Sequence, residues 1–163
     1  MLKQLQKRKS EGFTIIEVLI VLAIAGLIMV VVFLAVPALQ RSGRNNALNT
    51  DANNVLSAVG NYSSNNGGTL PTAITFAAGK ATIGAAGTNQ ETATVGSGTA
   101  TVKLNGAAIT NASVIGTIQV ITGTTAVCNS TGTGLAGSAS PRSYAILYVA
   151  ESGSGNILKC VGA

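Results

Sequence analysis

The stretch that decides the fold runs from Gly12 to Ile20, reads Gly-Phe-Thr-Ile-Ile-Glu-Val-Leu-Ile, and opens a longer apolar run. From Val18 to Val36 no side chain is charged or strongly polar. A helix over 13–39 would be about 40 Å long at about 1.5 Å per residue, which exceeds the hydrocarbon core of a bilayer, about 30 Å. A soluble helix is rarely apolar on every side for such a length. The segment therefore needs a hydrophobic surround, either lipid or further copies of itself.

A short basic segment precedes the apolar run. It ends at Gly12, and Phe13 follows directly. Its charged residues are Lys3, Lys7, Arg8, Lys9 and Glu11. A single carboxylate, Glu17, lies near the start of the run itself.

This arrangement, from Ser10 to Leu34, resembles the leader and cleavage site of type IV prepilins and related pilin-like proteins. In that family a membrane aspartic peptidase cuts after the glycine on the cytoplasmic side, and the new N-terminal residue is N-methylated. The fifth residue after the cut is typically glutamate. The resemblance implies cleavage between Gly12 and Phe13 and methylation of Phe13. It also implies that Glu17 acts in assembly by pairing with an N-terminal amine, either that of its own Phe13 or that of a neighbouring subunit.

Three other interpretations of the apolar run are open. A secretory signal peptide could be cut after the small residues of Ala23-Ile24-Ala25, but Glu17 would interrupt its apolar region, and the run is longer than the usual stretch of roughly 7–15 residues. A signal anchor that stays in the membrane explains the run, but not the glycine–phenylalanine junction or the glutamate. A chance motif in a buried helix is the third interpretation.

The charge distribution predicts the orientation of the chain. The formal net charge is +5, and removing Met1–Gly12 takes away four positive and one negative side chains, which leaves about +2. The basic leader outweighs Arg41 and Arg44 on the other side of the run, so the leader should face the cytoplasm and the rest should be exported. Because the positive charge is mainly in the leader, it is weak evidence for nucleic-acid binding.

Cys128 and Cys160 form an even pair in the part of the chain that should be exported. An intramolecular disulfide is the simplest interpretation, and two buried free thiols are the alternative. A zinc site is not expected, because the sequence has no histidine and no second cysteine pair.

Beyond the apolar run the helix should continue with one apolar face. Pro37 predicts a kink over 33–37. The spacing of four, three, four and three residues places an apolar stripe toward the rest of the chain, at Leu48, Ala52, Val55, Val59 and Tyr62. Asn65-Asn66-Gly67-Gly68 should end the helix.

The remaining sequence predicts strands after an irregular stretch. Thr69–Gln90 is rich in Gly, Ala and Thr and reads as a loop region, with at most a short strand at Ala81–Ile83. Strands are expected at Thr99–Leu104, Val114–Thr122, Ser143–Ala150 and Asn156–Cys160. The last two should form a hairpin, and Thr131–Ser140 should be a loop inside the disulfide. The fold class is therefore α+β, a long helix on an antiparallel sheet, which is also what the resemblance to pilins implies.

Four segments follow from these patterns. Residues 1–12 form a leader removed by prepilin peptidase, 13–39 a hydrophobic transmembrane or filament-core helix, and 40–64 its amphipathic continuation. Residues 65–163 form a head with a disulfide loop near its C-terminal end.

The sequence offers little catalytic chemistry. It contains no histidine, which excludes Ser-His and Cys-His pairs. After Glu17 the carboxylates are Asp51, Glu91 and Glu151, and no spacing among them suggests an acid–base pair or a calcium loop. We expect no enzyme, no cofactor and no metal.

Two further patterns have ordinary explanations. N-glycosylation sequons begin at Asn61, Asn111 and Asn129, and such matches are expected by chance in a sequence rich in Asn, Ser and Thr. The basic residues beyond the helix are scattered, at Lys80, Lys103, Arg142 and Lys159. Scattered charges of this kind usually solvate a surface, so DNA binding is possible but unsupported.

The resemblance implies a structural subunit of a type IV pilus. It would be a single-pass protein of the inner (cytoplasmic) membrane with an exported head, and afterwards part of an extracellular homo-oligomeric filament. Its partners would be the membrane, the prepilin peptidase, an assembly ATPase and a platform protein. The alternatives are a type II secretion pseudopilin or a minor pilin, and, in another class, a monomeric bitopic membrane protein with a DNA- or surface-binding head.

Overall fold

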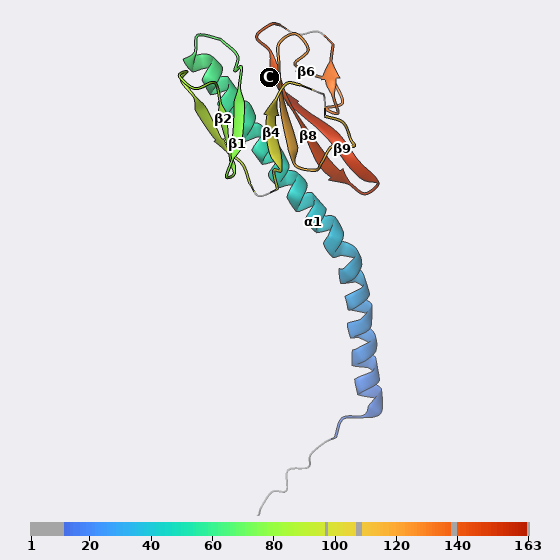
Figure 1. Cartoon of the computed structure of the whole chain (residues 1–163). Coiled ribbons are helices and arrows are strands. Elements are labelled where there is room, and N and C mark those ends of the chain that lie inside the picture. The colour runs from blue at the N-terminus through green and yellow to red at the C-terminus, as the bar shows by residue number, and fades with distance from the viewer. Residues whose placement is uncertain (1–11, 97, 107–108, 138–139, 163) are drawn as a thin grey trace, which may run out of the picture. The chain divides into compact units, whose positions relative to one another are not determined.

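The computed structural model describes residues 12–96, 98–106, 109–137 and 140–162. The leader residues Lys3, Lys7, Arg8, Lys9 and Glu11 lie outside these ranges. The described residues contain one long helix, α1 (Ile15–Asn65), followed by short strands (Figure 1). The strands are β1 (Ile74–Ala77), β2 (Lys80–Ile83), β3 (Glu91–Thr94), β4 (Thr101–Leu104), β5 (Thr117–Thr122), β6 (Val127–Cys128), β7 (Leu135–Ala136), β8 (Tyr144–Ser152) and β9 (Gly155–Gly162).

The chain divides into two compact units, Met1–Leu39 and Gln40–Ala163. In the first unit, every described side chain is exposed. Among the described residues, α1 is the one helix long and apolar enough to cross a membrane, by length and composition. The helix is continuous through Pro37, and the kink expected near that residue stays a prediction.

In the second unit, the predicted apolar stripe of α1 is confirmed. All five of its side chains are buried, and two more buried residues of the same helix, Asp51 and Ala58, were not predicted. The helix also ends where the sequence indicated. Gly67 and Gly68 have φ angles of 64° and 82°, and the Gly68 N–H donates to the carbonyl of Ser63 at 2.7 Å. Glycine adopts this left-handed geometry without steric cost.

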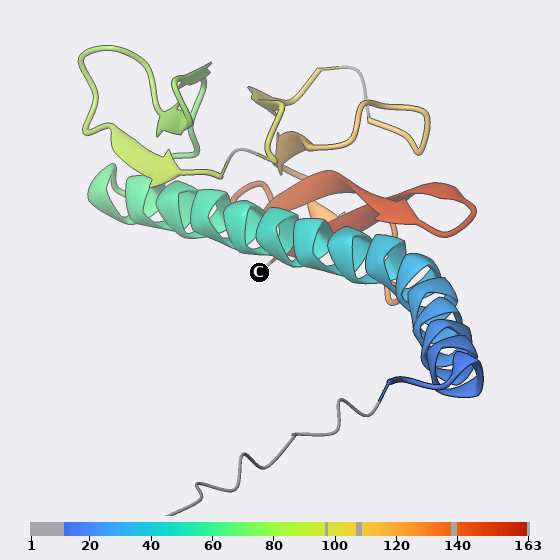
Figure 2. The ribbon, with the colours of Figure 1, turned by 90° about the horizontal axis from the view of Figure 1, so that it is seen from below.

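The strands form three sheets. β1, β2 and β3 make an antiparallel three-stranded sheet, and β6 pairs with β7. The largest sheet has the order β4-β5-β8-β9, and part of α1 lies along the three-stranded and four-stranded sheets in both views (Figures 1 and 2). The four strands predicted from the sequence are all present, with their ends shifted by at most three residues, and β8 and β9 form the expected hairpin. The α+β class is confirmed.

The expectation of an antiparallel sheet needs one correction, because β4 and β5 pair in parallel. The segment between them returns the chain to the starting end of β4, where the Ala100 N–H donates to the carbonyl of Gly116 at 2.9 Å. The buried side chain of Gln119 holds this crossing segment. It accepts a hydrogen bond from the Ile109 N–H at 3.0 Å and donates one to the carbonyl of Asn105 at 2.8 Å.

Within the predicted loop region Thr69–Gln90, the short strand at Ala81–Ile83 is confirmed as part of β2. The rest of that prediction was wrong, because β1 precedes β2 and the two form a hairpin. Its two-residue turn, Ala78-Gly79, has positive φ angles of 49° and 71°. This is the backbone sign of a type I′ turn, which matches the twist of the flanking strands. Alanine rarely adopts that conformation, so the turn carries no usual sequence signal. β3 was not predicted either, and β7 lies inside the predicted Thr131–Ser140 loop.

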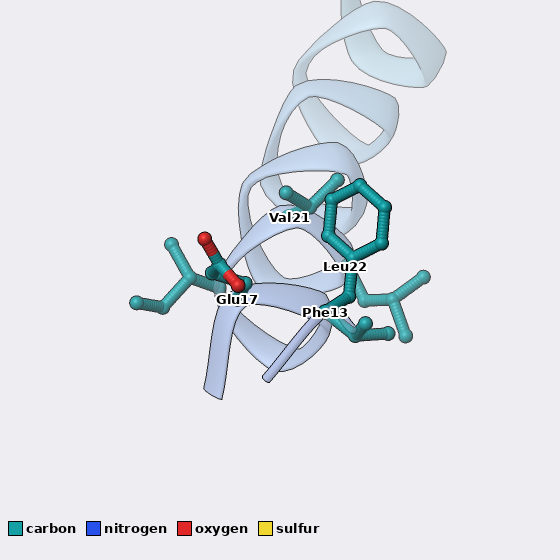
Figure 3. A pocket seen from close by; sticks show the side chains of 6 residues that line it. Phe13, Glu17, Val21 and Leu22 are labelled. Atoms are coloured by element: carbon teal, nitrogen blue, oxygen red, sulfur yellow. The ribbon is translucent and has the colours of Figure 1, made fainter. Parts of the chain in front are cut away.

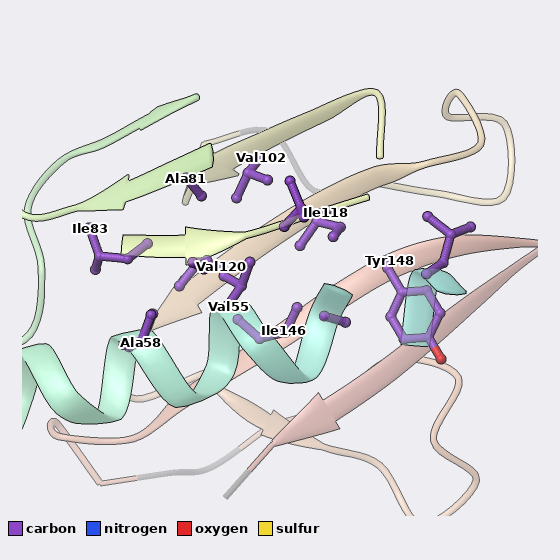
Figure 4. Close-up of a cluster of buried hydrophobic side chains, with 14 of the residues drawn as sticks. Val55, Ala58, Ala81, Ile83, Val102, Ile118, Val120, Ile146 and Tyr148 are labelled. Carbon is purple, nitrogen blue, oxygen red and sulfur yellow. The ribbon is translucent and has the colours of Figure 1, made fainter. Parts of the chain in front are cut away.

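Both faces of the four-stranded sheet are buried. On one face, side chains of α1 pack against residues of both sheets (Figure 4). The opposite face carries a second, smaller cluster, whose buried residues are Ile109, Ile121, Ala126, Ala145, Leu147, Val149 and Cys160. Strand β8 supplies alternate residues to the two clusters, which explains its nearly continuous apolar sequence.

The disulfide between Cys128 and Cys160 closes the second cluster. It joins β6 to β9, with the two Cα atoms 5.6 Å apart, and it is the pairing expected from the sequence. Since β9 lies at the edge of the four-stranded sheet, the bond connects that edge to the short β6–β7 sheet.

Asp51 positions the segment that connects β3 of the three-stranded sheet to β4 of the four-stranded sheet. Its carboxylate is buried on α1 and accepts hydrogen bonds from the Gly96 N–H at 2.9 Å and the Thr99 hydroxyl at 2.7 Å. Both partners lie between β3 and β4. One side chain of the helix therefore positions the connection between the two sheets that pack on it.

Replacing Asp51 should destabilise the second unit. Asp51→Ala leaves the Gly96 N–H and the Thr99 hydroxyl without their acceptor, and hydrogen bonds to charged groups contribute about 1.5–3 kcal/mol each. We expect a lower urea midpoint for the full chain in detergent, followed by near-ultraviolet circular dichroism. Asn46→Ala, at an exposed position of the same helix, is the matched control. An unchanged midpoint for Asp51→Ala would contradict this role.

Breaking the disulfide should also weaken the second unit. The two cysteines are 32 residues apart, and on the chain-entropy model closing such a loop contributes about 3–4 kcal/mol. Cys128→Ser should lower the unfolding midpoint and leave membrane insertion intact. Mass mapping of the wild-type protein without reductant checks the bond, and free thiols at both positions would disprove it.

Candidate functional site

The candidate site is the beginning of α1, where the processing motif expected from the sequence lies. Gly12, Phe13 and Thr14 precede the first helical residue, Ile15. Gly12 is exposed, and 87% of Phe13 is exposed. The bond between Gly12 and Phe13 therefore lies outside the helix, and its neighbourhood is accessible to solvent in this structure.

Thr14 and Glu17 form a reciprocal cap on the first turn. The Glu17 N–H donates to Thr14 Oγ1 at 3.3 Å, and the Thr14 N–H donates to Glu17 Oε2 at 3.0 Å. The Thr14 hydroxyl also donates to Glu17 Oε2 at 3.0 Å. This is a capping box, in which an N-cap threonine and a glutamate three residues later satisfy each other's backbone donors. The carboxylate of Glu17 is thus bound within its own chain.

The capping box was a signal that sequence reasoning missed. Threonine followed three residues later by glutamate, just before an apolar run, is a recognised helix start. The sequence Thr14-Ile15-Ile16-Glu17 has that form. Interpreting Glu17 only as a partner for an amine left its local role unnoticed.

A shallow hollow lies beside this cap. Its lining residues are Phe13, Glu17, Val18, Ile20, Val21 and Leu22 (Figure 3). Glu17 is the one charged residue among these six, and the others present apolar side chains. Such a surface offers contact to apolar groups of lipid or protein and a single negative charge.

The exposed apolar surface is concentrated in the first unit. Of the large hydrophobic side chains that are exposed in the described residues, all but Val114 belong to Phe13–Leu39. Contiguous apolar surface of this extent marks a protein or membrane contact. The motif residues Gly12, Phe13 and Glu17 lie at one end of this surface.

A second polar arrangement holds α1 to the tip of the β8–β9 hairpin. The Arg44 side chain donates from Nε to Glu151 Oε1 at 2.7 Å and from Nη2 to Oε2 at 2.6 Å. These bonds lower the pKa of Glu151 and raise that of Arg44. The side chain of Asn45 bonds both backbone groups of Glu151, each at 2.8 Å. The partners are more than 100 residues apart, and no local pattern indicates the pairing.

The carboxylates of the second unit occupy separate places. Asp51 bonds the connection between the sheets, Glu91 accepts from the Asn65 side chain at 2.6 Å, and Glu151 pairs with Arg44. Among the residues that the structure describes, no group of three or more His, Cys, Asp or Glu could hold a metal ion.

The remaining candidates from the sequence are not brought together in one site. Lys80, Lys103 and Arg142 are exposed, and Lys159 is half-buried. Two of the three sequon asparagines bond the backbone: Asn111 Oδ1 accepts from the Leu158 N–H at 2.7 Å, and Asn129 Oδ1 accepts from the Thr133 N–H at 3.0 Å. Asn61, the third, is exposed on α1.

Comparison with known proteins supports the significance of the helix start. No curated protein and no solved structure matches the chain. One family model does match: the prokaryotic N-terminal methylation motif, over residues 7–33. The matched residues include the glycine–phenylalanine junction, the capping box and most of the apolar run. The chain therefore carries the type IV prepilin-like signal motif, as found in type IV pilin-like and pseudopilin-type proteins.

Proposed function

We propose that this chain is the structural subunit of a type IV pilus. It is inserted in the membrane as a prepilin, cleaved after Gly12, methylated on Phe13 and polymerised through its N-terminal helix. The observation that carries the proposal is the apolar segment Phe13–Leu39, which is exposed along its length, overlaps a methylation motif and carries one carboxylate, Glu17.

Each segment of the chain has one role in this proposal. Residues 1–12 are the leader removed by the prepilin peptidase, and 13–39 first span the inner membrane and later form the filament core. Residues 40–64 continue the helix as the support of the head, and 65–163 make up the rest of the exported head. The basic leader keeps the N-terminus in the cytoplasm.

Polymerisation provides the hydrophobic surround that the exposed helix needs once it leaves the lipid. Apolar helices packed side by side bury one another, and a repeated heterologous contact that does not close generates a helical fibre. The chain supplies no nucleotide chemistry in this scheme. An assembly ATPase and a platform protein would act on it.

Glu17 provides the specificity of the assembly. A charged side chain in the middle of the bilayer costs about 2.5–3.5 kcal/mol on insertion scales. Near the helix start that cost is small, and the capping box with Thr14 already satisfies the carboxylate. Cleavage creates a positive amine on Phe13, four residues from Glu17. Inside a filament the buried carboxylate would pair with this amine, either in its own chain or in a neighbouring subunit. Pairing with a neighbour's amine would also fix the axial register, because only one stagger joins the two charges.

Blocking the cleavage site tests the processing step. Gly12→Val places a branched side chain at the residue before the cut, and we expect the chain to keep its leader. Gly26→Val is the matched control, since it makes the same substitution within the apolar run, where an added side chain meets no neighbour. The intact mass of membrane protein distinguishes the two. A mature wild-type chain that starts anywhere but Phe13 would disprove the proposal.

Removing the carboxylate tests the assembly step. Glu17→Ala should still insert and be cleaved, because the Thr14 hydroxyl keeps its bond to the residue 17 amide, but it should form few or no filaments. Blots of sheared filaments provide the measurement, and Glu91→Ala is the control. Wild-type filament yield from Glu17→Ala would remove this role. Trace recovery of the wild type itself would favour a minor pilin or a pseudopilin.

A further inference from the structure

The capping box determines where α1 begins, and this position relative to the scissile bond has a consequence for processing. An N-cap residue has a non-helical backbone, while its carbonyl accepts the first intrahelical bond. Thr14 fits this description, since its carbonyl accepts from the Val18 N–H at 3.4 Å. The helix therefore starts two residues after the carbonyl of Gly12, which belongs to the bond that is cut.

A helix that began further upstream would occupy that carbonyl. In a continued helix, the Gly12 carbonyl would accept from the Ile16 N–H and the Phe13 carbonyl from the Glu17 N–H. The Glu17 N–H is bound instead to Thr14 Oγ1, at 3.3 Å. The capping box thus competes directly with extension of the helix through the scissile bond.

The sequence contains an alternative helix start upstream. Ser10 is a residue type that caps helices well, and Glu11 would follow it in the first turn, where acidic side chains are favourable. A helix capped at Ser10 would place both Gly12 and Phe13 in its first turn. A helix capped at Ser10 would include Gly12, and glycine inside a helix costs roughly 1 kcal/mol. A good N-cap contributes about the same. The free-energy difference between a helix that starts at Ser10 and one that starts at Thr14 is therefore small enough for one side chain to change.

We propose that Thr14 is a positioning residue for cleavage: its cap holds the Gly12–Phe13 bond outside the helix, in a form that a peptidase can bind. Hydrolysis adds water across this amide and releases the leader with a Gly12 carboxylate and the mature chain with a Phe13 amine. The inference rests on the proposed function, since it concerns the same processing step.

The experiment uses the full precursor, purified in detergent from cells without the peptidase, and purified prepilin peptidase. Thr14→Ser and Thr14→Asn keep a capping side chain, whereas Thr14→Val has nearly the shape of threonine but no acceptor. Initial cleavage rates are measured by intact mass. The Cα and carbonyl chemical shifts of Gly12 and Phe13 report independently whether the helix has extended.

We expect Thr14→Val to be cleaved more slowly, by up to about fivefold, with helical shifts at Gly12 and Phe13. An N-cap worth about 1 kcal/mol changes the ratio of the two helix starts by about that factor. Thr14→Ser and Thr14→Asn should remain within about twofold of the wild type. Adding Ser10→Ala to Thr14→Val removes the upstream cap and should restore most of the rate.

Two results would overturn the inference. One is equal cleavage of all Thr14 variants. The other is slow cleavage of Thr14→Val with shifts that stay non-helical, which would mean that the peptidase contacts the hydroxyl itself. Neither result would affect the proposed function, which fails instead if the wild-type precursor is not cut after Gly12.

Discussion

The structure depends on one physical constraint: a long apolar helix cannot remain in water. Moving apolar surface out of water is favourable by about 25 cal/mol per Å². The exposed side chains of Phe13–Leu39 therefore require an apolar environment. The second half of the same helix meets the same requirement differently. There the apolar side chains form one stripe, and two sheets cover it. The first part of α1 is apolar on all sides and the second part on one side only. This change in the sequence marks where one environment of the helix ends and the other begins.

Much of this arrangement was predictable because it depends on local periodicity. The stripe from Leu48 to Tyr62 follows the helical repeat, and Gly67 and Gly68 mark its end with residues that adopt positive φ. The β8–β9 hairpin was predictable for a similar reason, since two apolar runs flank a Ser/Gly turn. In each case the signal lies within a few residues of the structure that it predicts.

The features that sequence reasoning missed have a different physical origin. The β1–β2 hairpin turns at Ala78-Gly79, and alanine at a positive φ angle is stabilised by the surrounding strands and not by its own preference. The parallel pairing of β4 with β5, the Asp51 contacts and the Arg44–Glu151 pair join residues that are distant in the chain. The capping box at Thr14 is the exception: its signal is local, and it indicates both the helix start and the place of Gly12 and Phe13 outside it.

The disulfide has a mechanical consequence when the chain is pulled, because it limits how far the second unit can extend. An unfolded chain extends by at most about 3.3–3.6 Å per residue, and the two cysteines are 32 residues apart in the sequence. Without the bond, this segment could extend to roughly 110 Å. The bond between Cys128 and Cys160 prevents this extension. The enclosed segment includes the whole of β8, the strand that contributes to both clusters. A pull on the chain can therefore loosen other parts of the second unit, but it cannot draw out its central strand as a free tether.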